Sequence, residues 1–535
     1  MDIKIGGYPL DKEQYKIATS NDKELLVVAG AGSGKTFTIV GRIWYLINIK
    51  KIKPEEILCI SYTRDASNSL KNKLLKEFNI DMNVYTFHKL AINILRDKNI
   101  KFEIASPDLL DLCIEEYLRM DILEYPEQLK YLRFILKINW HSKEEYLKIL
   151  DDKVYEINKF IKVVSAFIKL YKCNGYEINY FKELLDTLHK KILKKIDCYY
   201  ILIIFNIYIK YSNYLRENNE LDFDDLILQA TKLAKESCYI KKFKYIIIDE
   251  YQDSSFIRFN LIKEIVSSND SYFMAVGDDF QSIYKFSGSD IGLFIDFNKY
   301  FHNGNILKIQ TTYRNSQELV NIAGDFIMQN KKQLRKEMKS NSHVEKPIKI
   351  VYYSNEKEDF YKLCLYLKRN KRCNILVLGR NNNDIKAYIN DKLLLTEDKR
   401  IILKDEEEEL KNVKNREDKE KKSLDDNSPM KINYMTMHRS KGLECDDIVI
   451  INLKDEALGF PSQIEQDKIF EYIRKDTKKD FLDEERRLFY VALTRAKKNV
   501  YLFTPKKKSS IFIKELLKNY RKDLEIIKDY RMHDN

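Results

Sequence analysis

A glycine-rich segment after a short apolar run constrains the fold of this chain more than any other feature. It reads Ala29-Gly30-Ala31-Gly32-Ser33-Gly34-Lys35-Thr36 and lies between the apolar run Leu25–Ala29 and an amphipathic helical pattern. Small residues let backbone N–H groups wrap phosphate oxygens at the start of a helix. Lys35 can neutralise the β and γ oxygens of a nucleotide, and the Thr36 hydroxyl can ligate Mg²⁺. The order of strand, loop and helix therefore predicts a nucleotide-binding α/β domain, although Ala29 replaces the first glycine of the usual pattern.

Two acids at the end of another apolar run predict the second half of this site. Asp249 and Glu250 directly follow Tyr245–Ile248. In a phosphate-transferring site one carboxylate holds the metal, a role we assign to Asp249, and another orients the attacking water, which we assign to Glu250. An Asp-Glu pair after a core strand is also a common surface feature, so this assignment depends on the phosphate-binding loop.

Further apolar runs alternate with helical patterns along the chain. They occupy Ile57–Ile60, Phe273–Val276, Ile375–Leu378 and Ile448–Ile451. Unbroken runs of this kind suit strands that are buried on both faces of a parallel sheet. The alternation predicts an α/β fold with two parallel sheets.

Two segments depart from this alternation. Residues from about 91 to 219 are rich in Leu, Ile, Lys and Glu with almost no Gly or Pro, which predicts a mostly helical insertion. Residues from about 381 to 429 are charged and contain few aromatic residues, which is typical of a solvated helix or a partly disordered linker.

The composition permits a nucleic-acid partner without requiring one. The net charge of +12 arises from 94 Lys and Arg against 82 Asp and Glu, so both signs are abundant. The eight cysteines are scattered and form no Cys-x-x-Cys pair, which fits a reducing cytosol and gives no indication of zinc. No apolar stretch has the length of a signal peptide or a membrane span, so we expect a cytoplasmic protein with no membrane partner.

Ordered blocks over nearly the whole chain resemble the superfamily 1 helicases of the UvrD/Rep group. The blocks are Gln14, residues 29–36, Ser61–Ala66, Thr86–His88, Asp222–Leu226, Asp249–Ser254, Gly277–Tyr284, Thr312–Arg314, Thr436–Glu444 and Glu485–Ala496. Tyr284-Lys285-Phe286-Ser287-Gly288, Arg258 and Gly459-Phe460-Pro461 are similar to the helicase IV branch of this group.

The resemblance implies two RecA-like P-loop domains with parallel sheets. We expect the first core in residues 1–90 and 216–310, interrupted by a helical insertion in residues 91–215. The second core is expected in residues 311–382 and 431–535, and the last part includes the C-terminal tail. Residues 383–430 are expected to form a charged linker or a vestigial accessory insertion, because UvrD and Rep place a much larger domain there. An amino-terminal extension of the helicase IV kind and a RecB-type nuclease domain are not expected.

The resemblance also assigns roles around ATP. Gln14 would read the adenine edge, Tyr313 would stack on the adenine face and Glu444 would bond the ribose. Arg314 and Arg495 would act as arginine fingers from the second core, because a planar, permanently charged guanidinium suits the charge that develops on phosphoryl oxygens. Gln281 would sense the γ-phosphate. The expected catalytic set consists of Lys35, Asp249, Glu250, Gln281, Arg314 and Arg495, with Mg²⁺ on Thr36 and Asp249.

A second set of residues is expected along a DNA strand. Single-strand binders combine aromatic platforms for bases with polar contacts to phosphates. By resemblance, the expected platforms are Tyr62, Phe87, Tyr284 and Phe286, with Phe223 as a weaker candidate. The expected phosphate contacts are Thr63, Arg64, His88, Thr436 and His438. An aromatic residue in an α/β protein is more often part of the core, so each platform is also open to that interpretation.

The implied activity is an ATP-dependent 3′–5′ DNA helicase that moves on single-stranded DNA and unwinds tailed duplexes in repair, replication or recombination. One alternative is a translocase subunit of a larger complex for protein displacement or phage defence. Another is a binding module that uses ATP only as a switch, which the intact catalytic set argues against. The sequence identifies no repair or defence protein as a partner.

Overall fold

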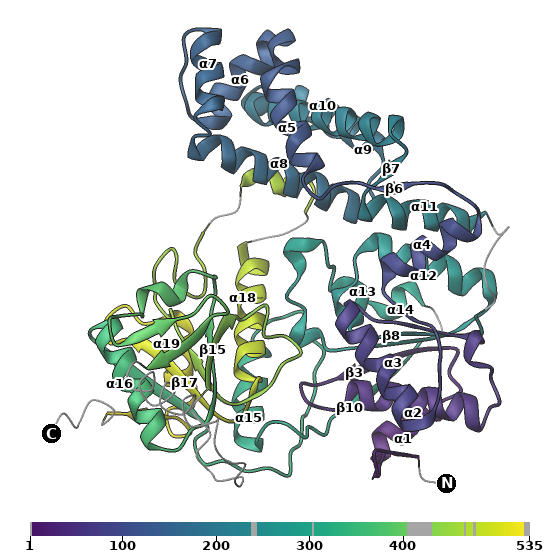
Figure 1. Ribbon diagram of the computed structural model, residues 1–535, viewed down its shortest axis with the longest axis vertical. Coiled ribbons are helices and arrows are strands. Elements are labelled where there is room, and N and C mark those ends of the chain that lie inside the picture. The colour runs from purple at the N-terminus through teal and green to yellow at the C-terminus, as the bar shows by residue number, and fades with distance from the viewer. Residues whose placement is uncertain are drawn as a thin grey trace, which may run out of the picture.

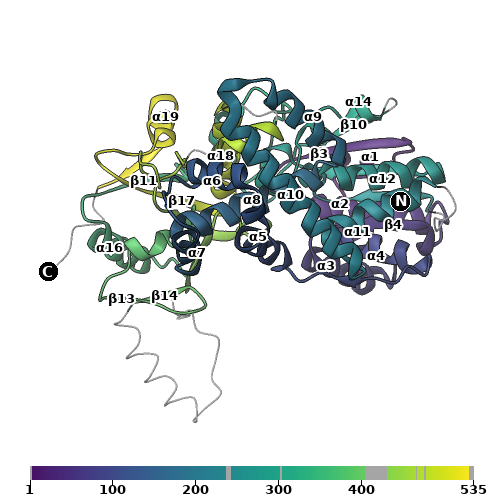
Figure 2. The same ribbon diagram turned by 90° about the horizontal axis from the view of Figure 1, so that it is seen from above.

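The computed structural model describes residues 3–236, 243–301, 304–403, 431–464, 467–474 and 478–528. Figure 1 shows two α/β bodies side by side and a helical body above them. Seen from above, the helical body lies over the junction between the two α/β bodies (Figure 2). The two α/β bodies are called the first core and the second core below.

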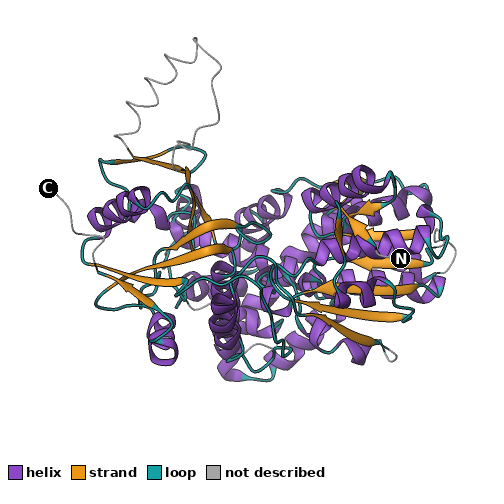
Figure 3. Ribbon diagram, turned by 90° about the horizontal axis from the view of Figure 1, so that it is seen from below, coloured by secondary structure: helices purple, strands orange, loops and turns teal. Residues whose placement is uncertain are grey.

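The first core is built on a six-stranded, all-parallel sheet (Figure 3). In spatial order its strands are β10 (Asn305–Ile309), β3 (Glu24–Ala29), β9 (Tyr272–Gly277), β8 (Tyr245–Ile248), β4 (Ile57–Ile60) and β5 (Val84–Tyr85). Neighbouring residues of one strand face opposite sides, so that Val27 packs in one hydrophobic cluster and Val28 in another. Both faces are therefore buried, as the apolar runs predicted.

Helices cover both faces of this sheet. One face is covered by α1 (Lys12–Ala18), α2 (Lys35–Asn48) and α3 (Arg64–Phe78), and the other by α4 (Phe87–Asp97), α11 (Phe223–Lys235), α12 (Phe256–Asn269), α13 (Gly292–Ile295) and α14 (Phe297–Tyr300). The helical insertion was expected to start at residue 91. Ala91 instead lies on α4, which packs against α11 within the first core. An amphipathic pattern alone does not show which body a helix packs against, and this explains the difference.

The helical body consists of six α-helices between two short strands. The helices are α5 (Leu109–Arg119), α6 (Pro126–Leu136), α7 (Lys143–Asp151), α8 (Tyr155–Cys173), α9 (Ile178–His189) and α10 (Lys195–Glu217). The strands β6 (Glu103–Ile104) and β7 (Glu220–Leu221) pair where the chain leaves and re-enters the first core. Among the described residues, no helix has the length and apolar character to cross a membrane.

The second core contains an eight-stranded sheet. Its strands in spatial order are β13 (Leu393–Leu395), β14 (Arg400–Leu403), β15 (Lys431–Thr436), β12 (Asn374–Gly379), β16 (Cys445–Ile450), β17 (Ala496–Pro505), β11 (Ile348–Tyr353) and β18 (Glu525–Ile527). The last six are parallel. The helices α15 (Gln317–Ile327), α18 (Lys478–Leu493) and α19 (Ile511–Tyr520) cover one face, and α16 (Glu356–Arg369) covers the other. The α/β class with two mostly parallel sheets is thus confirmed.

The segment expected to be a charged linker from residue 383 begins differently. Residues 384–403 contain a short 3₁₀ turn and the strands β13 and β14, which extend the sheet by an antiparallel hairpin. Leu393, Ile401 and Leu403 are buried against the sheet, and these apolar residues explain why the charged character does not prevent folding here. The remaining part of the expected linker, residues 404–430, lies outside the described residues.

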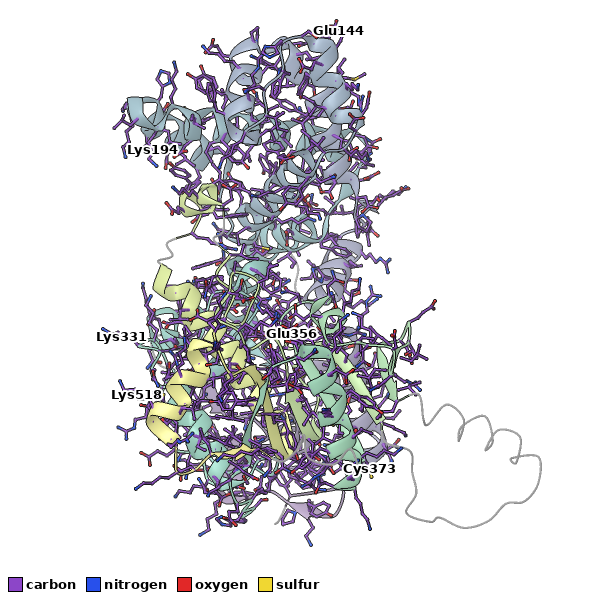
Figure 4. The ribbon with its side chains drawn as sticks, turned by 90° about the vertical axis from the view of Figure 1, so that its left-hand side faces the viewer. Glu144, Lys194, Lys331, Glu356, Cys373 and Lys518 are labelled. Carbon is purple, nitrogen blue, oxygen red and sulfur yellow. The ribbon has the colours of Figure 1, made fainter. Side chains whose placement is uncertain are left out.

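A segment of the second half of the chain packs into the helical body. This docking segment, residues 467–474, contains the 3₁₀ helix η8 (Lys468–Tyr472) and lies beneath α8 in Figure 1. Ile469 and Ile473 are each 2% exposed within the core of the helical body. Asn174 Nδ2 donates to Ile473 O at 3.1 Å, and Lys194, labelled in Figure 4, lies 5.8 Å from the Tyr472 ring centroid. The helical body is therefore completed by residues about 250 positions distant in sequence from α10.

We expect Ile473→Ala to destabilise the protein by about 2–5 kcal/mol, because it removes buried methyl groups from a packed core. Urea unfolding monitored by circular dichroism measures this loss. The matched control is Ile464→Ala, since Ile464 is exposed and its truncation should change stability by less than about 0.5 kcal/mol. Equal unfolding midpoints for the two variants would contradict the packing described here.

Candidate functional site

The phosphate-binding loop follows β3 and ends at the start of α2. Gly32 and Gly34 have φ angles of +70° and +79°, a region that L side chains rarely adopt. Ser33 is buried, and its hydroxyl has no hydrogen-bond partner within the described residues. A buried, unpaired hydroxyl in a loop at a helix N-terminus fits a phosphate oxygen, because such a group costs free energy unless a ligand satisfies it.

The predicted acids lie at the end of β8, beside this loop. Lys35 Nζ donates to Glu250 Oε2 at 3.1 Å, and Glu250 N donates to Asp249 Oδ1 at 2.9 Å. Burial and the charge of Glu250 raise the pKa of Asp249. Burial would raise the pKa of Glu250 as well, but the ammonium of Lys35 lowers it below the ordinary value. The pair therefore consists of an ionised Glu250 next to Lys35 and a more basic carboxyl at Asp249.

Lys35 is positively charged in this site. Burial alone would lower its pKa, but the carboxylates of Glu250, Asp278 and Asp249 raise it above the ordinary value. The oxygens of Asp249 and the Thr36 hydroxyl at the start of α2 are hard donors of the kind that Mg²⁺ prefers. These residues fit a nucleotide phosphate with its divalent cation.

The two expected arginine fingers lie beside each other on the second core. Arg495 is 1% exposed, and its Nη2 donates to Gln281 Oε1 of the first core at 3.1 Å. Burial and the charge of Arg314 lower the pKa of Arg495 to about 9, so it remains charged at neutral pH. Arg314 Nε donates to Glu444 Oε2 at 2.9 Å. Arg314 Nη1 also donates to Thr494 O at 3.5 Å, next to Arg495 in the chain, so the structure gathers Gln281, Arg495, Arg314 and Glu444 in one place.

The loop that carries Arg314 touches the phosphate-binding loop directly. Thr312 Oγ1 donates to Ala31 O at 2.8 Å, and Tyr313 N donates to Gly32 O at 3.0 Å. A Cβ at Gly32 would lie 2.5 Å from Arg314 Cβ, so only glycine allows this approach. The two cores therefore meet at the nucleotide loop.

The expected adenine contacts lie on the other side of the loop. Gln14 is buried, accepts from Asp11 N at 3.1 Å and donates to Ser33 O at 3.1 Å. Tyr313 is 63% exposed, and its hydroxyl donates to Asp11 Oδ2 at 2.8 Å. Tyr313 thus has a free ring face for an adenine, whereas both amide atoms of Gln14 contact the protein in this conformation.

A lysine of the second core connects the predicted nucleotide site to the aromatic residues. Lys441 Nζ bonds to the carboxylate of Asp253 and donates to Gln281 O at 2.8 Å. The same ammonium lies 5.0 Å from the Tyr284 ring centroid. The sequence predicted no individual role for Lys441 or Asp253, although both lie within the quoted blocks. A polar residue directly beside an assigned site residue is the signal that could have identified them.

The expected DNA residues gather where strands end. Tyr62, Thr63 and Arg64 follow β4, residues 86–88 follow β5, and Thr436 ends β15. The carboxyl ends of parallel strands form the usual ligand-binding edge of an α/β sheet. Thr63 Oγ1 accepts from Ala66 N at 3.1 Å and so caps α3, while Thr63 and Arg64 are exposed on this edge.

Aromatic rings from both cores form a row on this edge. The Tyr62 and Tyr284 rings are nearly parallel with centroids 6.4 Å apart, and Phe286 lies 6.1 Å from Tyr284. Phe286 also meets the His438 ring of the second core at 5.5 Å, and 54% of Phe286 is exposed. These rings offer stacking surfaces at the junction of the cores.

The other candidates on this edge differ in exposure. Phe223 is 46% exposed and contacts the His88 ring at 5.0 Å. Phe87 is 3% exposed and packs in the hydrophobic cluster of the first core, so in this conformation it offers no face to a base. Burial lowers the pKa of His88 to about 4 and that of His438 to about 3. Both rings are neutral at pH 7 and can only donate a hydrogen bond to a phosphate, without charge.

Two helicase family models match most of the chain. Residues 10–302 match the UvrD/REP helicase N-terminal domain, and residues 394–507 match the UvrD-like helicase C-terminal domain.

The chain belongs to the UvrD/Rep helicase family.

Individual relatives agree with this assignment and with the resemblance to helicase IV. DNA helicase IV of Escherichia coli (strain K12) is 28% identical over 96% of this chain and 71% of its own length. ATP-dependent DNA helicase Rep of Buchnera aphidicola is 31% identical over 63% of this chain and 48% of the relative. ATP-dependent DNA helicase PcrA of Bacillus subtilis (strain 168) is 28% identical over 65% of this chain and 43% of the relative. The matched region thus spans less than half the length of the Rep and PcrA relatives.

One further residue of this UvrD/Rep-family protein, beside the expected DNA platforms, received no individual role from sequence. Arg258 of α12 bonds to the Tyr62 hydroxyl, and its guanidinium lies 4.8 Å from the Tyr62 ring centroid. The same group lies 5.9 Å from the Phe87 ring. Arg258 therefore holds Tyr62 in place. Its only sequence signal was its place in the resemblance to the helicase IV branch.

Proposed function

We propose that this chain is an ATP-driven motor that moves 3′ to 5′ on single-stranded DNA and separates tailed duplexes. One observation carries the proposal. Lys35 and Glu250 of the first core face Arg314 and Arg495 of the second core across a single junction, and Gln281 contacts Arg495 directly. Such an arrangement completes the catalytic set only when both cores take part.

Each side chain has a chemical task in this proposal. Lys35 and the loop N–H groups bind the phosphates of ATP, and Glu250 orients the attacking water. Thr36 and Asp249 would hold Mg²⁺, which when bound neutralises phosphate charge. Arg314 and Arg495 stabilise the charge that develops on the γ-phosphoryl oxygens. Tyr313 stacks on adenine, with Gln14 and Glu444 on the base and ribose.

Hydrolysis is coupled to movement through the junction of the cores. ATP contacts groups of both cores, so it favours a closed arrangement, and loss of the γ-phosphate removes that preference. Gln281 and Lys441 connect the phosphate side to Tyr284, whose ring lies in the aromatic row. Closure and opening therefore move the platforms of the first core relative to the phosphate contacts Thr436 and His438 of the second core, which shifts the grip on the strand.

The test is strand displacement with the purified chain on 3′-tailed and 5′-tailed duplexes, with and without ATP. We expect displacement of the 3′-tailed substrate only, and only with ATP. Preference for the 5′ tail would contradict the proposed direction. Hydrolysis stimulated by single strands without displacement would instead support the translocase subunit of a larger complex. Binding of ATP without hydrolysis would support the switch alternative.

Replacing Phe286 with Ala should lower DNA-stimulated ATP hydrolysis more than basal hydrolysis. Loss of one stacked base weakens strand binding by about 1–3 kcal/mol, or about 5-fold to 150-fold in affinity. Steady-state turnover as a function of oligo(dT) concentration measures the effect as a raised half-saturating concentration. Phe134→Ala is the matched control, because Phe134 is 56% exposed on α6 of the helical body. An equal effect of both substitutions would remove Phe286 from the strand path.

A further inference from the structure

A fully buried lysine lies outside every motif block of the chain. Lys336 belongs to the linking segment, residues 331–340, which lies between α15 and β11 of the second core and contacts the first core on the way. Its side chain is 0% exposed, and Nζ lies 2.5 Å from Asp278 Oδ1 and 2.6 Å from Asp279 Oδ1. The same ammonium lies 3.6 Å from the Phe280 ring centroid. One cation is thus enclosed by three consecutive residues that follow β9.

The two aspartates are held from other sides as well. Leu334 N donates to Asp279 Oδ2 at 2.8 Å, and Gln333 Nε2 donates to the same oxygen at 3.1 Å. Burial raises the pKa of Asp279, and the charge of Lys336 opposes this change. The linking segment therefore supplies the cation and two neutral donors to one loop of the first core. Without the cation, two adjacent buried carboxylates would lose the ammonium that pairs with both of them, which is strongly unfavourable.

Asp278 connects this cation to the nucleotide sensor. Its second oxygen, Oδ2, accepts from Gln281 Nε2 at 2.6 Å. The other amide atom, Gln281 Oε1, accepts from Arg495 Nη2 at 3.1 Å. The orientation of the Gln281 amide is therefore set on one side by Asp278 and on the other by Arg495. A rotation of the Asp278 carboxylate would release the amide.

The linking segment also reaches the phosphate-binding loop. A Cβ on Gly30 would lie 2.3 Å from the terminal methyl of Met338, two residues after Lys336. Thr312 N donates to Lys339 O at 2.8 Å, which ties the segment to the loop that carries Arg314. The segment thus touches three nucleotide-facing loops, and Lys336 is its only charged side chain that is buried.

We propose that Lys336 is a positioning residue for ATP hydrolysis, which fixes Asp278 and thereby aims the Gln281 amide at Arg495. This inference rests on the proposed function, because it assigns Lys336 to the same catalytic site. Lys336 does not touch the nucleotide. It therefore affects the rate of hydrolysis and not the affinity for ATP.

The first test is Lys336→Met, which keeps an unbranched chain of similar length and removes the charge. We expect kcat for DNA-stimulated hydrolysis to fall by at least about tenfold, while KM for ATP changes by less than about threefold. Lys331→Met is the matched control, since Lys331 lies in the same segment and is exposed, as Figure 4 shows. The control should retain the kcat of the unaltered protein.

A second pair of variants separates positioning from stability. Lys336→Met combined with Asp279→Asn restores the net charge of the buried group but not the contact to Asp278. We expect this double variant to recover most of the Tm lost by Lys336→Met and to keep the low kcat. Asp279→Asn alone retains the Lys336–Asp278 contact and should hydrolyse ATP within about threefold of the unaltered protein.

The outcomes are distinct. Recovery of kcat together with Tm in the double variant would overturn the inference, because the role of Lys336 would then be structural only. Unchanged kcat in Lys336→Met, with an active unaltered protein, would overturn it as well and leave the proposed function intact. If the unaltered protein shows no DNA-stimulated hydrolysis, the proposed function and this inference fail together.

Discussion

Replacing Lys35 with Ala should abolish measurable ATP hydrolysis, with a loss of at least about 100-fold to 1,000-fold in kcat. The ammonium lies 3.1 Å from Oε2 of Glu250, the carboxylate proposed to orient the attacking water. The neighbouring carboxylates raise its pKa, so the side chain is charged at neutral pH and can bind phosphate oxygens. Removal of one preorganised group that stabilises developing charge typically lowers kcat by this factor. Release of phosphate in the presence of oligo(dT) measures the effect.

Single-strand binding should be largely retained in the same variant, because Lys35 lies at the phosphate-binding loop and not in the aromatic row. Fluorescence anisotropy with a labelled oligonucleotide tests this separation. Lys50→Ala is the matched control, since Lys50 lies just beyond α2 and is exposed. Undiminished turnover in Lys35→Ala would rule out the assigned site.

Replacing Arg495 should lower kcat about 1,000-fold or more, while the fold of the first core is kept. Arginine fingers contribute factors of this size to phosphoryl transfer. Arg495 is buried, and its Nε also donates to Val491 O at 3.0 Å, so Arg495→Ala can destabilise α18 and β17 as well. Arg495→Lys therefore serves as the second variant. It keeps a positive charge but lacks the planar fork, and we expect it to be nearly as slow as the Ala variant.

Stability and nucleotide binding separate the two effects of Arg495. Arg495→Lys should unfold within a few degrees of the unaltered protein and should still bind a fluorescent ATP analogue through the first core. Rapid hydrolysis by Arg495→Lys would show that a charge alone is sufficient and would contradict the finger assignment.

Local sequence patterns predicted the parts of the protein whose structure depends on neighbouring residues. Two strands show this, β3 and β8, because each is apolar on both faces. β3 ends at the predicted phosphate-binding loop, and β8 ends at the predicted acids Asp249 and Glu250. The contact between Lys35 and Glu250 follows from this, because β3 and β8 lie in one parallel sheet and their carboxyl ends share an edge.

Features that depend on distant contacts were not predicted. β5 has two residues, and β10 carries Asn305 and Lys308 among its apolar residues, so neither resembles a buried strand. The docking segment has apolar residues at 469 and 473, but no local pattern shows that they complete a helical body formed more than 250 residues earlier. The sequence does not distinguish Lys336 from the many surface lysines, because its ion pairs with Asp278 and Asp279 join residues more than 50 positions apart.

The central claim is that two cores complete one ATP site. A structure of the chain with a non-hydrolysable ATP analogue and a single-stranded oligonucleotide tests it most directly. We expect the γ-phosphate between Lys35 and the guanidinium groups of Arg314 and Arg495, each within hydrogen-bond distance of a phosphate oxygen. A bound analogue that contacts only the first core, with both guanidinium groups directed elsewhere, would contradict it.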